Sequence, residues 1–469
     1  MNYRTPGVYI DEIKRFPPSI AAVETAIPAF IGYTQRAVKR GEDLTLKPTR
    51  ISSLLEYEDF FGTAVNEQNL EVRLTLSPTG RLQFVADFDW SDGKGPSKHL
   101  MYYAMQQYFA NGGGPCYIVS VGAFLDFGTT ISDPTPFENA LEELEKFDEP
   151  TLLVVPEGQS MDEDSFFQVI GKALDQCVEL KDRFVIMDIP HSGRDLRTAG
   201  EIKEVADNFR NRLSVEEDVA KYGAAYFPNI RSTFNYLYDS TLANVKIFNQ
   251  GGGEIQLSEL TNSQKSNVIL ALNSLDIYLP PSAAVAGIYA RVDNSRGVWK
   301  APANENLRSV SDITCQITDR IQDFLNVDDT AGKSINAIRP FTGRGIKIWG
   351  ARTLNGNDNE WRYVPVRRFF NMVEESAKKA TFQFVFEPND KNTWTRVKSM
   401  VENFLFLQWR AGALMGATPE QAYFVKVGVP DTMTELDIWE GRMIVEIGMA
   451  VVRPAEFIIL KFMHKMVSE

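Results

Sequence analysis

The chain of 469 residues carries 49 lysine and arginine residues against 62 aspartate and glutamate residues, a formal net charge of −13, and 44% of it is hydrophobic. At about 150 residues per domain this length predicts two to four domains, each with a buried core, which excludes a disordered or fibrous chain. So negative a molecule is repelled by phosphate backbones and anionic lipids, which excludes nucleic-acid binding through a global basic field.

The cysteines and the first residues indicate the cellular compartment in which the chain is made. Cys116, Cys177 and Cys315 are odd in number and far apart, which favours neither a disulfide framework nor a metal-ligand cluster. We expect them to be small buried residues of a protein made in a reducing cytoplasm. Because residues 1–12 are charged and no later run reaches the roughly 18 apolar residues that span a bilayer, neither a secretory signal nor a membrane span is expected.

In chain order, the first predicted element is a short strand at residues 7–13, rich in β-branched and aromatic side chains and followed by a stiff spacer at Pro17-Pro18. A second apolar run covers 27–33. Residues 36–98 show no clear pattern and are interpreted as a small insertion. Apolar residues then recur at helical spacing over 99–110, where the predicted helix ends in a run of glycines.

The middle of the chain alternates short apolar runs with amphipathic ones. Strands are predicted at residues 117–121, 152–155, 184–189 and 224–227. Between them, Ser160 is predicted to cap a helix, with Glu163 as the acidic third position of a capping box. Such alternation indicates a βαβ layer with helices on both faces. A second insertion, at 231–279, interrupts this rhythm.

The last third contains six of the seven tryptophans. Helical spacing marks segments around Phe369 and Trp394, and strands are predicted at 423–429, 443–452 and 456–462. The last strand is apolar on both faces, so it must be covered on both sides, which is hard to arrange at a chain end.

The common catalytic and cofactor motifs fail at defining positions. Lys333-Ser334 resembles the end of a phosphate-binding loop, but the position of its first glycine holds Val327, so Lys333 is interpreted as a loop lysine. Gly343 and Gly345 start a dinucleotide fingerprint whose third glycine position holds Ile348, and they are interpreted as turn glycines.

Side chains for metal or acid–base chemistry are also not clustered in the sequence. The three histidines, His99, His191 and His464, lie far from one another and from cysteine, so structural roles are expected. The basic run 362–368 is interpreted as an ion-pairing surface for a protein partner. We therefore expect no catalytic residues, no cofactor, no metal and no enzymatic activity.

Several motifs in order resemble contractile tail sheath proteins. They are PGVYI (6–10), GIYARVD (287–293), RGVWKAPANE (296–305), NAIRPF (336–341), GRGIKIWGARTL (343–354), WRYV (361–364), VRR (366–368), FEPN (386–389) and VRPAEF (452–457). The length, the YRTP opening (3–6) and residues 101–114 are most similar to sheaths of extracellular contractile injection systems.

The resemblance implies an α/β and α+β multidomain fold: a tail-sheath-like inner domain with terminal strand-exchange arms, a middle βαβ layer domain and variable insertions. The implied parts are an N-terminal arm (1–20), core segments (21–35 and 99–115), an outer insertion (36–98), the middle α/β domain (116–230 and 280–305), a second insertion (231–279), an inner sheath domain (306–440) and a C-terminal strand-exchange segment (441–469).

It also implies a structural function. Copies would stack as helical rings around an inner tube, and contraction would drive the tube through a target membrane. Strand exchange between subunits is expected at Gly7, Val8, Tyr9, Ile10, Ile13, Phe457, Ile458, Ile459, Leu460 and Phe462. Hinges are expected at Pro17, Pro18, Pro430 and Pro454, and contact with the tube at Arg396, Ser399 and Glu402.

The implied partners are further copies of the chain in hexameric rings, the inner tube protein, baseplate and terminal cap proteins, and sibling sheath proteins, with no nucleic acid and no membrane insertion. The particle would be assembled in the bacterial cytoplasm and released. A bacteriophage tail sheath, a sheath-fold cap or adaptor, and a cytoplasmic nucleotide-binding α/β enzyme stay open as alternatives.

Overall fold

The computed structural model describes residues 20–76, 79, 81–90, 95–193, 195–328, 330 and 332–459. Its contacts divide the chain into two compact units. The α/β unit comprises residues 24–371 and 453–469, and the small unit comprises residues 1–23 and 372–452. The division falls within α10 (Val364–Thr381), and each unit is described by itself.

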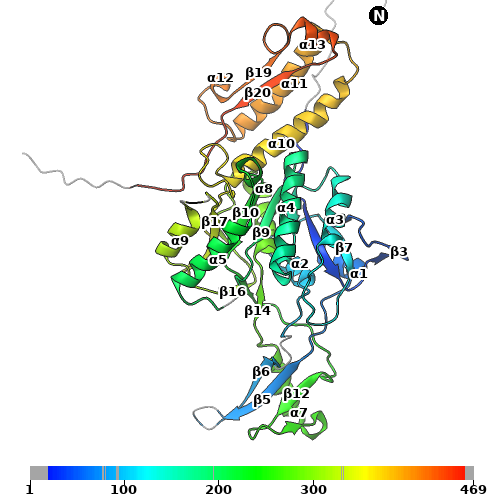
Figure 1. Ribbon diagram of the computed structural model, residues 1–469, viewed down its shortest axis with the longest axis vertical. Coiled ribbons are helices and arrows are strands. Elements are labelled where there is room, and N and C mark those ends of the chain that lie inside the picture. Colours follow the sequence, from blue (N-terminus) through cyan, green and yellow to red (C-terminus); the bar gives the residue numbers. More distant parts are fainter. Residues whose placement is uncertain are drawn as a thin grey trace, which may run out of the picture. The chain divides into compact units, whose positions relative to one another are not determined.

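A nine-stranded sheet forms the centre of the α/β unit (Figure 1). Its strands, in spatial order, are β15 (Glu305–Asn306), β18 (Gly345–Ile348), β17 (Ile335–Phe341), β10 (Gly223–Phe227), β9 (Phe184–Asp188), β8 (Leu152–Val154), β1 (Pro28–Thr34), β7 (Cys116–Ala123) and β4 (Thr49–Ile51). The strands from β17 to β7 run parallel, and antiparallel strands close both edges. The predicted middle strands and their parallel arrangement are confirmed.

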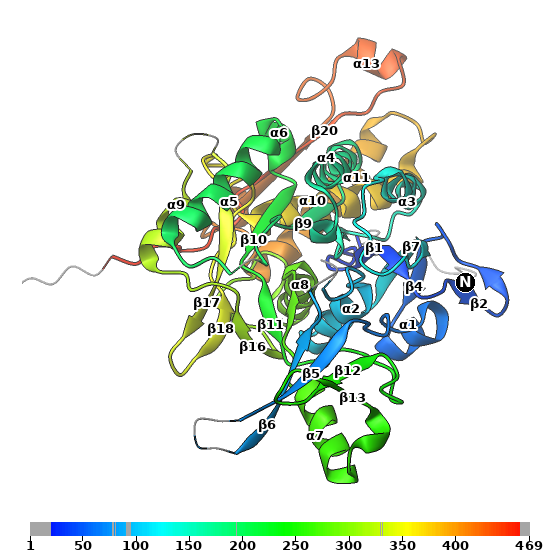
Figure 2. The same cartoon turned by 60° about the horizontal axis from the view of Figure 1, so that its bottom comes forward.

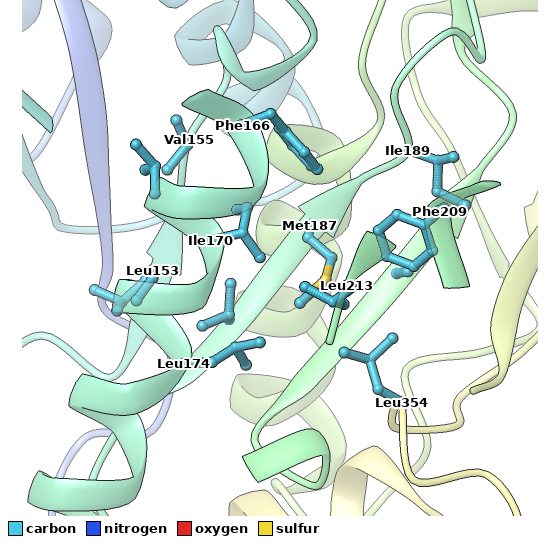
Figure 3. Close-up of a cluster of buried hydrophobic side chains, with 14 of the residues drawn as sticks. Leu153, Val155, Phe166, Ile170, Leu174, Met187, Ile189, Phe209, Leu213 and Leu354 are labelled. Atoms are coloured by element: carbon cyan, nitrogen blue, oxygen red, sulfur yellow. The ribbon is translucent and has the colours of Figure 1, made fainter. Parts of the chain in front are cut away.

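Helices cover both faces of this sheet because alternate strand residues enter two different cores. Leu153 and Val185 join one core, and Leu152 and Phe184 join the other. The first core is covered by α3 (Thr135–Glu145), α4 (Glu163–Leu180), α5 (Ala199–Arg212) and α9 (Asp319–Asn326), and the second by α1 (Leu54–Phe61), α2 (Met101–Ala110) and α8 (Ser282–Arg296). Figure 3 shows Phe166, Ile170 and Leu174 of α4 lying over strand residues of the first core.

The start of α4 differs from the prediction. Asp162, not Ser160, is the N-cap, and its carboxylate accepts a hydrogen bond from the Ser165 amide at 2.9 Å. Ser160 lies in a short 3-10 turn, and its hydroxyl donates to the Lys98 carbonyl at 2.7 Å. Asp and Ser are both good caps, so the type of residue alone did not decide which of them begins the helix.

The two predicted insertions join into one four-stranded sheet in the order β13, β12, β5, β6 (Figure 2). β5 (Leu70–Leu76) and β6 (Leu82–Phe88) come from the first insertion, whereas β12 (Val245–Phe248), β13 (Glu254–Ile255) and α7 (Asn262–Leu272) come from the second. β12 pairs with β5 in parallel, and α7 residues share a separate small core with both segments. We call this part the insertion sheet.

Smaller elements complete this unit. β11 (Ile230–Ser232), β14 (Ile277–Leu279) and β16 (Val310–Ile313) form a three-stranded sheet, β2 (Val38–Lys39) pairs with β3 (Glu42–Asp43), and α6 (Glu217–Ala220) precedes β10.

Two expected boundaries differ from the structure. From the first insertion, β4 is an edge strand of the large sheet and α1 packs on that sheet. β17 and β18, beyond residue 305, also belong to the large sheet.

The basic run at 362–368 is not a surface patch. Arg367 and Arg368 are buried. Arg368 forms an ion pair with buried Asp293 at 2.6 Å, and the Arg367 guanidinium lies 4.4 Å from the centre of the Trp361 ring. The interpretation as a partner-binding surface is therefore corrected: at helical spacing these arginines face inward, where acidic and aromatic groups from other segments receive them.

The small unit contains α11 (Lys391–Arg410), α12 (Pro419–Ala422), α13 (Glu435–Trp439), β19 (Tyr423–Val427) and β20 (Val445–Met449). Across the part of the chain that the structure describes, no helix has both the length and the apolar composition needed to cross a bilayer.

Candidate assembly interface

The small unit presents a two-stranded antiparallel sheet. Tyr423 of β19 lies opposite Met449 of β20, and Val427 lies opposite Val445. Helix α11 packs against β19. Val425 is only 4% exposed, whereas its neighbour Phe424 is 45% exposed. One face of the sheet is therefore covered within the unit, and the other face remains accessible.

This sheet also has open edges. Among the described residues it contains two strands and no third. The Ala450 amide donates to the Ala422 carbonyl, toward β19, so the alternate residues Ile447 and Met449 direct their amides to the outer edge of β20. Unpaired backbone donors and acceptors in a row are a template for an added strand.

The C-terminal segment of the α/β unit offers such a strand. Residues 453–459 have no regular secondary structure, and Phe457, Ile458 and Ile459 are all at least 70% exposed. Three consecutive large apolar side chains facing water are unfavourable for an isolated chain, because each forgoes about 1.5–3 kcal/mol of burial free energy. The described part of the predicted last strand is therefore present without cover.

Glu456 ties this segment to the body of the unit. Its carboxylate accepts hydrogen bonds from Arg352 (Nε 3.0 Å, Nη2 2.6 Å), from Asn326 Nδ2 at 2.9 Å and from the Tyr363 hydroxyl at 3.2 Å. Burial acts to raise the pKa of Glu456, but these donors outweigh it and lower the pKa below its ordinary value. This contact was not predictable from the sequence, because Arg352 and Glu456 lie in separate motifs and nothing in their spacing brings them together.

Several predicted interface residues lie outside the described residues. They are Gly7, Val8, Tyr9, Ile10, Ile13, Pro17, Pro18, Leu460 and Phe462.

The predicted hinge at Pro430 stays a prediction. Pro430 lies in the connection between β19 and β20, which pair with each other. Within that connection the Thr432 amide donates to the Gly428 carbonyl at 2.9 Å, and Thr434 caps α13. Residues 445–449, which lie in the expected C-terminal strand-exchange segment, pair with β19 of the same chain.

Pro454 lies two residues before Glu456, in a segment without regular secondary structure. As a predicted hinge, it stays a prediction.

The predicted tube contact lies on α11. Arg396 and Ser399 are exposed and Glu402 is half-buried. The Arg396 guanidinium lies 5.2 Å from the centre of the Phe384 ring, and Glu402 pairs with Lys398 at 3.8 Å. These three residues share one helix face by spacing, and their role in tube binding stays a prediction.

The parallel strands of the large sheet follow the order β7-β1-β8-β9-β10-β17, which also occurs in nucleotide-binding α/β proteins. In such proteins the ligand lies where successive strands are added on opposite sides of the first one, which here is beside β1. Buried side chains occupy this position at the carboxyl ends of the strands. Glu157, after β8, accepts a hydrogen bond from the Tyr33 amide at 2.9 Å and lies 3.3 Å from His99 Nδ1. The Leu125 amide donates to His99 Nε2 at 3.0 Å, so that lone pair is already engaged and His99 has a structural role.

The other candidates for chemistry also have structural partners. Lys333 lies in the loop before β17, as predicted, and is buried there. Its ammonium donates to the carbonyls of Arg210 (2.8 Å) and Leu213 at the end of α5, an arrangement that favours a helix C-terminus. All three cysteines are free and buried, as predicted. Among the described residues, no group of three or more histidine, cysteine, aspartate or glutamate side chains is arranged to hold a metal ion.

Two family models match the chain. The phage tail sheath protein central domain matches residues 174–354, and the phage tail sheath C-terminal domain matches residues 356–464. The tail sheath protein of Enterobacteria phage T4 is 26% identical over 136 residues, which is 29% of this chain and 20% of that protein. The chain thus spans about a fifth of the length of that curated relative.

Two solved structures match over nearly the whole chain. The sheath complex of an extracellular contractile injection system, PVC, in its contracted state is 30% identical with a TM-score of 0.65, covering 99% of both chains. The contracted helical sheath of the anti-feeding prophage, AFP, is 31% identical with a TM-score of 0.64, covering 99% of this chain and 100% of the other. Both the predicted resemblance and the multidomain fold are confirmed, and the chain belongs to the contractile tail sheath family.

Proposed function

We propose that this chain is the structural subunit of a contractile sheath, whose copies stack as helical rings around an inner tube and contract to drive that tube through a target membrane. The observation that carries the proposal is that one chain holds both halves of a strand-exchange joint. The β19–β20 sheet has open edges among the described residues, and Phe457 to Ile459 form an apolar segment without cover.

The joint works by strand addition. Residues 7–13 and 457–462 provide about six to seven residues each, and extended strands of those lengths reach about 20–23 Å, enough to cross to an adjacent copy. Each donated segment gains backbone hydrogen bonds and buries alternate side chains when it enters the β19–β20 sheet of another copy. Contacts of this kind are heterologous and do not close on themselves, so they build a helical array.

Contraction is a rearrangement of subunits that stay joined. In our proposal the copies rotate and move outward as near-rigid bodies while the donated strands remain in their acceptor sheets. The contact with the inner tube is weak and breaks as the copies move. The particle is completed by a baseplate and a terminal cap.

We infer the type of particle from the extent of each similarity. Similarity to the PVC and AFP sheaths extends over the whole chain, whereas similarity to the phage T4 sheath protein covers less than a third of it. We therefore assign the chain to an extracellular contractile injection system rather than to a phage tail. Such a particle is assembled in the bacterial cytoplasm and then released. A structural role also accounts for the absence of predicted catalytic residues.

Negative-stain microscopy of the purified chain tests this function. We expect striated cylinders, and we expect a chain lacking residues 1–20 to remain folded but form none, because one donated strand is missing. Discrete rings would instead indicate a cap, and compact monomers that bind nucleotides in a thermal-shift assay would indicate an enzyme. Either result contradicts a sheath.

Arg396→Glu tests the tube contact. If Arg396 faces the tube, reversing its charge weakens sheath–tube association, and cylinders assemble without an inner tube. The Ser399→Ala and Glu402→Gln variants should show smaller effects in the same direction. The readout is the fraction of cylinders with a filled lumen. Full lumens in Arg396→Glu cylinders would exclude this face from the contact.

A further inference from the structure

One carboxylate collects nearly all the polar contacts of the C-terminal segment. Both oxygens of Glu456 are bound: Oε1 by Arg352 and Asn326, and Oε2 by Arg352 and Tyr363. A guanidinium that approaches with two nitrogens fixes both the position and the plane of a carboxylate. This geometry is that of a built carboxylate-binding site.

Arg352 is held in place by contacts that do not involve Glu456. Arg352 is 4% exposed, and its Nη1 donates to the Asn326 carbonyl at 3.1 Å. The Arg352 backbone is also fixed, because its amide donates to Asn336 Oδ1 at 2.8 Å and its carbonyl accepts from Asn336 Nδ2 at 2.8 Å. Arg352 is therefore fixed by its own unit, whereas the segment that carries Glu456 has no regular secondary structure.

The described residues that directly follow Glu456 are apolar and make no comparable polar contacts. Phe457, Ile458 and Ile459 are exposed, although Phe457 and Ile458 line one side of a groove of about 570 Å³ whose other walls include Asp319 and Trp349. Glu456 is thus the last residue of the described segment whose side chain is hydrogen-bonded to the body of its own unit.

We propose that Arg352, Asn326 and Tyr363 form a carboxylate-binding site that holds Glu456 of the same chain and fixes the point at which the C-terminal segment leaves for a neighbouring copy. The pivot of the segment then lies after Glu456, not at Pro454. This inference rests on the proposed function and adds to it: the site sets the register of the donated strand and transmits the load between copies during contraction.

A pair of one-residue insertions tests the position of the pivot. A glycine inserted between Arg453 and Pro454 lengthens the chain before the site, so residues 457–462 keep their distance from the anchor and cylinders still form. A glycine inserted between Glu456 and Phe457 shifts the donated strand by one residue and turns each side chain to the opposite face, so the number of cylinders falls at least tenfold. Equal effects of the two insertions would overturn the proposal.

Substitutions test the chemistry of the site. Glu456→Ala should make the C-terminal segment of the unassembled chain at least tenfold more sensitive to proteolysis and reduce cylinder formation, and Tyr363→Phe, which removes one donor, should do so more weakly. Asp319→Asn is the matched control, because Asp319 pairs with Arg339 at 2.8 Å and lines the same groove but lies on α9.

The outcomes separate this inference from the sheath function. If the unaltered chain forms no cylinders, the function itself fails. If it forms cylinders, and the Glu456→Ala and Tyr363→Phe variants assemble, contract and resist proteolysis as it does, only the anchor is refuted. Because Tyr363→Phe leaves the ion pair intact, it remains informative if Glu456→Ala does not fold.

Discussion

Glu67 is a buried carboxyl group at the point where the chain enters the insertion sheet. Its Oε2 accepts a hydrogen bond from the Ser97 amide at 2.9 Å, and its own amide donates to the Leu237 carbonyl at 2.7 Å. Its Oε1 has no hydrogen-bond partner among the described residues. Burial raises the pKa of Glu67 to about 8, partly opposed by the Ser97 hydrogen bond. The residue is therefore mostly protonated in the folded chain at neutral pH.

This pKa makes stability depend on pH. Since the folded chain binds a proton that the unfolded chain releases above its ordinary pKa of 4.5, the free energy of unfolding should fall as pH rises from about 4.5 to about 8. The slope contributed by one such group is about 1.4 kcal/mol per pH unit. Glu67→Gln removes it, so we expect equal stability of the two proteins at pH 5 and a variant more stable by roughly 2–4 kcal/mol at pH 8.5.

Urea denaturation at the two pH values measures this difference, with Glu204→Gln, an exposed carboxyl group on α5, as the control. Parallel pH profiles for the Glu67→Gln variant and the unaltered chain would mean that Glu67 is ionised in the folded protein.

Single residues were the least predictable level from sequence. The buried state of Cys116 follows from its place in an apolar strand, but Glu67 lies in a segment without a pattern, and the inward orientation of Arg368 depends on Asp293, far away in the sequence. From sequence alone, a charged residue is predicted to lie on the surface unless its ion-pair partner is known. Sequence gives the partner only when it lies within a turn or two.

At the scale of elements, the parallel strands were predictable because both of their faces are buried, which leaves short, continuous apolar runs. β5, β6 and β12 lack that signal. They belong to a small sheet with a single helix packed on it, and its parallel β5–β12 pair joins segments from two separate insertions. The open sheet β19–β20 was predicted as strands, but the sequence does not say that its edges are free.

The outer edge of β20 can be tested with one substitution. The Ile447 amide points away from β19, so Ile447→Pro removes a donor that only an added strand would use, whereas Gly448→Pro removes a bond of the β19–β20 pair itself. We expect Ile447→Pro to give a folded chain that forms no cylinders, and Gly448→Pro to lower the melting temperature of the unassembled chain. Circular dichroism and negative-stain microscopy provide the two measurements.

Normal cylinders from the Ile447→Pro variant would contradict strand addition at β20. Added strands would then pair with the outer edge of β19, or would not join the β19–β20 sheet.

At the scale of the whole molecule, assembly brings together copies that each carry a net charge of −13. Their long-range repulsion opposes polymerisation, whereas strand addition and apolar burial favour it and depend little on salt. The Debye length falls from about 30 Å at 0.01 M salt to about 8 Å at 0.15 M, so repulsion between neighbouring copies is largely screened at the higher concentration.

Salt should therefore promote cylinder formation. We expect the critical concentration for assembly, measured by sedimentation, to fall severalfold between 0.01 M and 0.15 M sodium chloride. The reason is that salt weakens the repulsion between copies more than it weakens strand addition and apolar burial. If ion pairs between copies supplied most of the binding free energy, the same increase would raise the critical concentration instead. The direction of the salt effect thus decides whether strand addition or charge pairing holds the copies together. The β19–β20 sheet, whose edges no other described strand covers, favours strand addition.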